Sequence, residues 1–290
     1  MTTVEGMEPR MSDGAAAEER IRRRFSGHDP EAGTDTGGTP WAGRQLTSTG
    51  FDGDTGTADA RLLELLGARQ GGPHGGQGGL GANDDVEAAF DADTALVELV
   101  ARARLLVPVV AVAGETTEVN GLVSDASSDM AAVTLVAPDG QKALPAFTSL
   151  ATLADWDASA RPVPVAAQRA AQAAVQEGCH EIVLDVGAPS YAILRGSMVW
   201  SLAMGQAWVP PHRDPQVRSG VEAAVADEPD VRAVTLAGAP GGALRLDLML
   251  RPGLTPEGLQ QLAQRVGERI ALDGEIRARI DALAFNISAG

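Results

Sequence analysis

The stretch Leu244-Arg245-Leu246-Asp247-Leu248-Met249-Leu250 alternates leucine with Arg, Asp and Met. Successive side chains of a strand point to opposite faces, so this strict period of two predicts a strand with one buried face. After this strand, Thr255-Pro256 predicts the start of a helix, because Thr255 can cap it and proline is favoured at the first helical position. The apolar stripe of that helix consists of Leu259, Leu262, Val266 and Ile270.

This strand is expected to belong to a C-terminal unit at residues 212–290. Val217, Val221 and Val225 share one face of a preceding helix. A strand at Val231–Ala237 and a final strand around Phe285 complete the order α-β-β-α-β, with an extra helical turn near Arg277. We expect a small antiparallel sheet covered by helices.

Residues 84–211 predict a second α+β unit, which ends at the helix-breaking Trp208-Val209-Pro210-Pro211. A polar loop from Gly114 to Asp129 follows the first apolar strand, and the turn at Pro138-Asp139-Gly140 predicts a hairpin. The expected strands are Leu105–Ala113, Met130–Val136, Gln141–Phe147, Glu181–Val186 and Tyr191–Leu194. The expected helices are one with Leu96, Leu99 and Val100, one capped by Thr148-Ser149 and ending near Trp156, and Ala166–Glu177 and Gly196–Gln206.

Residues 1–83 hold 18 of the 34 glycines and bury too little apolar surface to offset their ordering entropy. We expect a disordered glycine-rich arm with short helices at Ala15–Phe25 and Thr57–Ala68, the second capped by Thr57 and docked on the body. The predicted fold class is therefore α+β: two small mixed or antiparallel sheets covered by helices, preceded by the arm.

Composition excludes several classes of protein. The 39 acidic residues outnumber the 23 basic ones, and the formal charge of −16 repels nucleic-acid phosphates and anionic lipids. The longest uncharged tract, residues 196–211, is shorter than the ~20 apolar residues of a membrane-spanning helix. The single Cys179 excludes an intramolecular disulfide and a multi-cysteine metal cluster. With no secretory signal visible, we expect a cytoplasmic protein.

The familiar motifs of enzymes do not fit this sequence. The glycine spacing at residues 76–81 lacks the preceding strand of a dinucleotide-binding loop, and the only lysine, Lys142, follows Gln141 and so cannot belong to a P-loop. Cys179 and His180 are adjacent at the start of a strand, so their side chains diverge. No catalytic, cofactor-binding or metal-binding residue is predicted.

Two loops at strand ends remain as candidate contact segments. Ser127-Ser128-Asp129-Met130 ends the long polar connection, and Asp185-Val186-Gly187 follows a buried strand. Such residues usually make turns, since Asp bonds nearby backbone and glycine tolerates positive φ. The alternative is that Ser127, Ser128, Asp129, Met130, Asp185 and Gly187 contact a ligand or partner. We interpret the tryptophans at 156, 200 and 208 as core or interface side chains.

An ordered series of segments resembles the SseB family in its high-GC Gram-positive form. The series comprises Gly50–Asp59, Leu106–Val112, Ser127–Ala131, Leu144–Ser149, Leu153–Asp157, Arg161–Val165 and Trp208–Pro211. It spans residue 50 to the end, although the glycine tract between Gly71 and Gly81 departs from the pattern. The resemblance implies a link to enhanced serine sensitivity, which is a phenotype, and supplies no catalytic residues.

Two hypotheses of function follow from these observations. The first is a non-enzymatic cytoplasmic factor that binds a protein partner, without a cofactor and without nucleic acid or membrane contacts, and serves amino-acid metabolism or stress response. The second is a small-molecule sensor or enzyme with a site between the two domains, where pockets often form.

Overall fold

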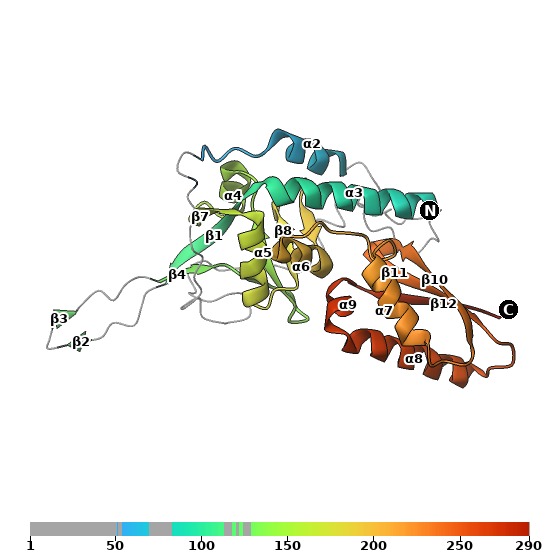
Figure 1. Cartoon of the computed structure of the whole chain (residues 1–290). Coiled ribbons are helices and arrows are strands. Elements are labelled where there is room, and N and C mark those ends of the chain that lie inside the picture. The colour runs from blue at the N-terminus through green and yellow to red at the C-terminus, as the bar shows by residue number, and fades with distance from the viewer. Residues whose placement is uncertain are drawn as a thin grey trace, which may run out of the picture.

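The structure, a computed structural model, describes residues 51, 54–69, 83–112, 118–119, 122–123 and 129–289. It contains two units, each with its own apolar core, and the cores divide between Trp208 and Val217, on either side of the predicted boundary (Figure 1). The predicted disordered arm and the helix at 15–25 lie largely or wholly outside the described residues. The α+β fold class is confirmed.

Two small sheets form the framework of the N-terminal unit. One has the strand order β4-β1-β7 and is antiparallel; the other has the order β5-β6-β8-β9, in which β6 and β8 run parallel. The sheets meet where Leu106 and Phe147 exchange two backbone hydrogen bonds of 2.8 Å. The strands are β1 (Arg104–Val112), β4 (Asp129–Ala132), β5 (Leu135–Val136), β6 (Lys142–Ala146), β7 (Arg161–Ala166), β8 (Glu181–Leu184) and β9 (Ala192–Leu194), with a separate hairpin of β2 (Glu118–Val119) and β3 (Leu122–Val123).

The strand predicted at Met130–Val136 is in fact two strands that pair in different sheets. The register of β1 with β4 ends at Val109 and Ala132, next to Pro108, which has no N–H to continue the ladder. The N–H of Val133 donates to the Pro108 carbonyl, and the chain then enters β5. The hairpin prediction is confirmed for β5 and β6, whose turn is closed by Gly140 at φ 82°.

Strand β7 was not predicted, because Pro162 and Pro164 argue against a strand. The two prolines lie two residues apart, so their ring nitrogens, which carry no hydrogen, both point to the same edge of the strand. Since β7 is an outer strand of its sheet, that edge needs no N–H donors.

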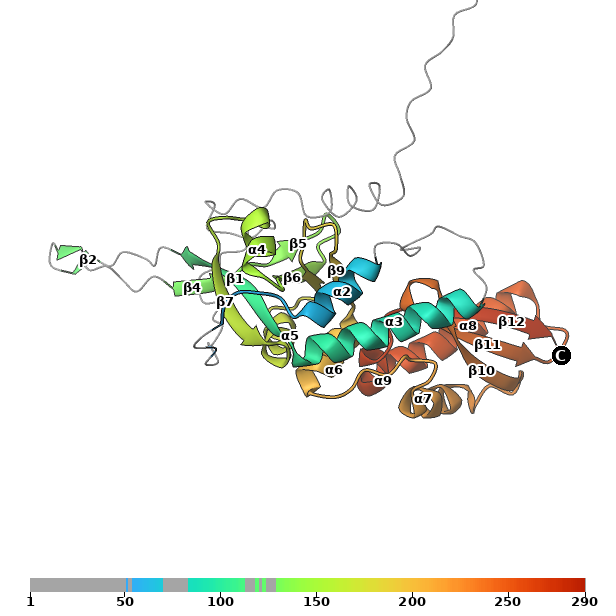
Figure 2. The ribbon, with the colours of Figure 1, turned by 90° about the horizontal axis from the view of Figure 1, so that it is seen from above.

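Helices cover these sheets and connect the two units (Figure 1). In the N-terminal unit they are α2 (Ala60–Arg69), α3 (Asn83–Arg102), α4 (Leu150–Trp156), α5 (Ala167–Gln176) and α6 (Gly196–Met204). Figure 2 shows α3 running from one unit to the other. Its second half is buried in the N-terminal core through Leu96 and Val100. Its first half reaches the C-terminal sheet, where a Cβ at Gly238 would lie 2.5 Å from the Phe90 ring.

The body also includes residues 54–59, which we predicted to belong to the arm. Asp54 pairs with Arg104 at 2.7 Å, and the Leu150 N–H donates to the Gly56 carbonyl. The docking of α2 is confirmed, because Leu62 and Leu66 are buried. The predicted cap was wrong: Asp59, not Thr57, accepts the first free N–H groups of α2, since it stands directly before the helix.

The C-terminal unit has the predicted order α-β-β-α-β, with the extra helical turn α9. Its sheet has the order β10-β11-β12. The sheet is mixed and not purely antiparallel, because the crossover through α8 returns the chain so that β12 runs parallel to β11. The elements are α7 (Pro215–Val225), β10 (Val231–Ala239), β11 (Ala243–Leu250), α8 (Pro256–Leu272), α9 (Gly274–Ala278) and β12 (Leu283–Ala289), with a short 3-10 turn at Pro240–Gly242.

One prediction concerns the two faces of β11. Leu248 is fully buried against the helices, and its neighbour Met249 is exposed on the other face. Leu248→Asp should lower the free energy of unfolding by more than about 3 kcal/mol, because it buries a carboxylate without a partner. Met249→Asp, with the same charge on the open face, should change it by less than about 1 kcal/mol. Similar losses in urea unfolding would mean that the buried face is misassigned.

A second prediction concerns acid stability. Hydrogen bonds from Arg265 to Glu228 lower the pKa of this buried carboxyl, and the charge of Arg269 adds to the effect. A carboxyl whose pKa is lowered on folding stabilises the protein above its unfolded pKa of about 4.3 and loses that contribution as the pH falls. Glu228→Gln should therefore reduce stability at neutral pH and flatten its decline below about pH 4.3. Glu222→Gln, at an exposed position of α7, is the matched control and should leave both unchanged.

Candidate functional site

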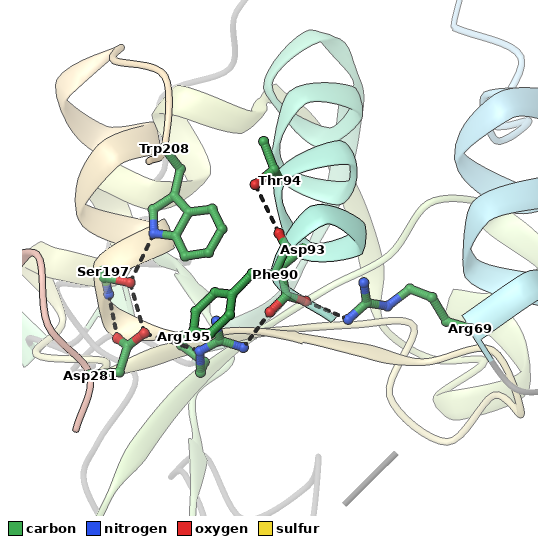
Figure 3. A network of polar contacts seen from close by, with 8 residues as sticks. All are labelled: Arg69, Phe90, Asp93, Thr94, Arg195, Ser197, Trp208 and Asp281. Carbon is green, nitrogen blue, oxygen red and sulfur yellow. Dashed lines mark hydrogen bonds and ion pairs between the residues drawn. The ribbon is translucent and has the colours of Figure 1, made fainter. Parts of the chain in front are cut away.

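Helix α6 takes its N-terminal cap from the other unit. Arg195 stands at the cap position and offers no side-chain acceptor. Asp281, two residues before β12, fills the role: its Oδ1 accepts the Ser197 N–H at 2.7 Å and its Oδ2 accepts the Ser197 hydroxyl at 2.7 Å (Figure 3). A carboxylate at this end also compensates the positive end of the helix dipole. The C-terminal unit thus completes a helix of the N-terminal unit.

Arg195 joins the two units through charge. Its Nη1 lies 2.9 Å from Asp93 Oδ2 on α3, and its Nε lies 3.0 Å from Asp281 Oδ2 (Figure 3). Its guanidinium carbon lies 5.9 Å from the centre of the Trp208 ring, within the range of a cation–π contact. A Cβ at Gly242, in the turn between β10 and β11, would lie 2.5 Å from this guanidinium, and the φ of 81° there also favours glycine.

Asp93 is the shared acceptor of the network. Its side chain is only 9% exposed, and its Oδ1 lies 2.6 Å from Arg69 Nη2 on α2. Two cations from different elements therefore share one buried carboxylate. Since a buried charge is tolerated only when it is paired and hydrogen-bonded, Asp93 holds α2, α3 and the segment before α6 together.

Aromatic side chains shield these charges from water. Trp208 is 5% exposed and donates its Nε1–H to Ser197 Oγ at 3.0 Å. Its ring lies stacked on Phe90 of α3, 6.4 Å between centroids. Trp200 packs under Arg279, whose guanidinium carbon lies 4.7 Å from its ring centre. The low polarity of these neighbours strengthens each ion pair that they cover.

A second set of ion pairs fastens α3 to the segment before α7. Arg213 pairs with Glu87 and, at 2.6 Å, with Asp91, and Glu87 also contacts His212 at 3.2 Å. The Arg213 hydrogen bond lowers the pKa of Glu87 against the opposing effect of burial, and Asp91 and Glu87 raise the pKa of Arg213. Within the C-terminal unit, Arg279 donates to Asp214 at 2.9 Å, directly after Arg213.

Most polar groups of the network are paired within it. Ser197 Oγ accepts from Trp208 and donates to Asp281, so its proton and one lone pair are engaged. Elsewhere at the junction, His212 Nδ1 and Arg279 Nε are buried without a hydrogen-bond partner among the described residues. Beside Asp93, Arg69 Nη1 and Arg195 Nη2 are also buried without such a partner. These N–H groups suit an anionic acceptor. Residues 51–289, so far as they are described, contain no group of three His, Cys, Asp or Glu side chains placed to hold a metal ion.

The predicted contact loops lie elsewhere and on different sheets. Ser127 and Ser128 are outside the described residues, while Asp129 and Met130 begin β4 opposite Val112 and Ala111. Asp185 and Gly187 follow β8 of the other sheet. The structure therefore places the two loops in separate strand ladders.

Asp185 is fully buried, and its carboxylate binds the N-terminal turn of α4. It accepts from the Thr148 N–H at 2.8 Å, the Thr148 hydroxyl at 2.7 Å and the Thr152 hydroxyl at 2.7 Å. Its φ of 51° and that of Gly187, 85°, form the tight turn. These contacts favour the turn interpretation of this loop. Cys179 is buried and His180 is exposed, although both lie just before β8 and not within it.

Sequence reasoning missed Asp93, Arg195 and Asp281. Isolated charged residues are normally solvated, and no local pattern relates positions so far apart. One signal was present: the helix predicted at Gly196 begins without Ser, Thr, Asp or Asn before it. A buried helix without its own cap requires an acceptor from elsewhere in the chain.

Comparison with known proteins assigns the N-terminal unit. Residues 85–201 match the model of the SseB protein N-terminal domain. The N-terminal unit contains an SseB N-terminal domain. No curated protein and no solved structure matches it. Among the helices of residues 60–278 that the structure describes, none has the length and apolar character needed to cross a membrane.

The SseB domain match divides the network in two. It includes Asp93, Arg195 and Ser197 but ends within α6, before Trp208 and Asp281. The SseB domain therefore supplies Arg195, Asp93 and Phe90, and the rest of the chain supplies Arg69, the helix cap Asp281 and Trp208. The network belongs to the combination of both units.

We predict that Asp281 is the main polar link of the junction. Asp281→Ala leaves Arg195 short of one carboxylate and α6 uncapped, so the free energy of unfolding should fall by about 3 kcal/mol. Asp273→Ala removes an exposed cap of α9 within the same unit and should cost about 1 kcal/mol. Hydrogen exchange at the first amides of α6 should accelerate in the first variant only. Equal losses and unchanged exchange would contradict this role.

Proposed function

We propose that this SseB-family chain is a non-enzymatic binding or accessory factor that acts through a protein partner. One observation carries the proposal: the carboxylates of Asp93 and Asp281 and the hydroxyl of Ser197 at the junction are all engaged with other groups of the chain. General acid–base and nucleophilic catalysis require a group that is free to take a proton or attack a substrate. The carboxylates of Asp93, Asp185 and Asp281 are committed to structural partners instead.

The proposed setting is the cytoplasm, in amino-acid (serine) metabolism or stress response. The link to serine rests on what the SseB name implies, enhanced serine sensitivity. The proposal excludes nucleic acid and membranes as partners, because the charge of −16 opposes binding to phosphate-rich surfaces. It requires no cofactor.

The second candidate is a small-molecule sensor, or an enzyme, with its site between the units. The unpartnered N–H groups of Arg69 and Arg195 favour it, because they flank Asp93 at the junction and suit an anionic ligand. Such a ligand would compete with the ion pairs that hold the units together. This candidate therefore also predicts that binding loosens α2 or the C-terminal unit.

Purification of the tagged, full-length protein from its own host tests the two candidates. Mass spectrometry of the intact sample, with metabolite profiling, should find a protein at a fixed ratio to the chain and no bound small molecule at that ratio. Arg69→Gln is the matched variant, since Arg69 contacts Asp93 but not the C-terminal unit. The partner should be retained by this variant. A stoichiometric small anion that is present in the native sample and lost with Arg69→Gln would overturn the proposal in favour of the sensor.

A further inference from the structure

The outer edge of β12 is open among the described residues. In the strand order β10-β11-β12, β12 pairs with β11 on one side only. Its sequence, Leu283-Ala284-Phe285-Asn286-Ile287-Ser288-Ala289, contains no charge and no proline. Charged residues, prolines and bulges are the devices by which proteins prevent an edge strand from pairing further. β12 has none of these in its seven residues.

The backbone groups at this edge can be assigned from the pairing with β11. Leu244 lies opposite Leu283, and its N–H donates to the Ala282 carbonyl at 2.9 Å. In a parallel ladder this means that even-numbered residues of β12 bond β11, while odd-numbered ones point away. The outward N–H and C=O groups therefore belong to Leu283, Phe285, Ile287 and Ala289.

The opposite edge of the same sheet is protected. The register of β10 with β11 shifts between Val231 and Ala233, as in a bulge, and places the exposed Arg232 there. A bulge and a charge both disfavour added strands. The contrast marks the β12 edge as the one available for pairing.

The distribution of charge favours a second copy of the chain as the occupant. Residues 212–290 hold 11 acidic and 9 basic residues, so 14 of the 16 net negative charges lie in the remainder of the chain. Two copies would repel one another through most of their surfaces but not through this unit. Leu283, Phe285 and Ile287 are also only partly buried against the C-terminal core, so a partner strand would cover them.

We propose that the chain forms a two-fold dimer in which β12 pairs antiparallel with β12 of a second copy. A strand edge that pairs with itself across a two-fold axis must be antiparallel. With the axis normal to the sheet, both helical layers lie on one side of a continuous six-stranded sheet of order β10-β11-β12-β12-β11-β10. This inference is independent of the proposed function.

One register satisfies all the outward backbone groups. When Phe285 lies opposite Ile287 of the other copy, Leu283 lies opposite Ala289, and all four odd-numbered residues are hydrogen-bonded. Asn286 then faces its own copy across the axis as a non-hydrogen-bonded pair, with Cα atoms about 4.5 Å apart. That separation is within the range of a disulfide, about 4.4 to 6.8 Å.

Two measurements on the full chain test the dimer. Because a single strand pair makes a small interface, the association should be weak, and sedimentation velocity should show the mean mass doubling as concentration rises from about 1 µM to about 300 µM. Under mild oxidation at the upper concentration, Asn286→Cys should form a covalent dimer. Ser288→Cys is the matched control on the same exposed face, and in this register it lies far from its own copy and should not cross-link. The native Cys179 is buried and should give no background.

A wild-type protein that stays monomeric over the whole concentration range would overturn the proposal. So would Ser288→Cys cross-linking as readily as Asn286→Cys, because the register would then be wrong or the contact random. Both cysteine positions are exposed, and equal thermal midpoints for the two reduced variants would show that folding is unaffected.

Discussion

The guanidinium of Arg195 fixes how the two units sit against each other. It reaches Asp93 on α3 and Asp281 before β12, on opposite sides of the junction. A partly buried cation is stable only while its carboxylates stay in place. Trp208 lies 5.9 Å from the guanidinium carbon, and Gly242 packs close to it. The placements of α3, α6 and the C-terminal sheet therefore depend on one another, and a shift of any one separates a buried charge from its partner.

The elements predicted best are those whose signal is local. The alternation along β11 and the stripe of α8 each encode which face is buried within one element, and the structure has both. Which strands pair with one another was harder to predict from the sequence. Nothing within Met130–Val136 shows that its two ends join different sheets, because the cause is Pro108 on another strand. The two prolines of β7 are acceptable only because that strand lies at an edge.

The junction could not be predicted for the same reason, at longer range. Asp93, Arg195 and Asp281 each look like ordinary solvated charges, since charged side chains are rarely buried unless paired. Their burial follows from the tertiary contact of α3 with both units, which brings Phe90 and Trp208 over the charges. Only the absent cap before α6 carried a local trace of it. The sequence thus indicated that an acceptor was needed and could not indicate which residue supplies it.

The charges of Asp93, Arg195 and Asp281 are paired within the molecule, so recognition of a partner falls to other surfaces of the two units. The residues outside the C-terminal unit carry nearly all of the net negative charge, and such a surface selects basic partners. The nearly neutral C-terminal unit leaves selection to backbone pairing and shape. The two kinds of contact are not isolated from one another. Asp281 stands two residues before β12 and caps α6, so a shift of β12 would move the carboxylate that accepts the Ser197 N–H of the SseB domain.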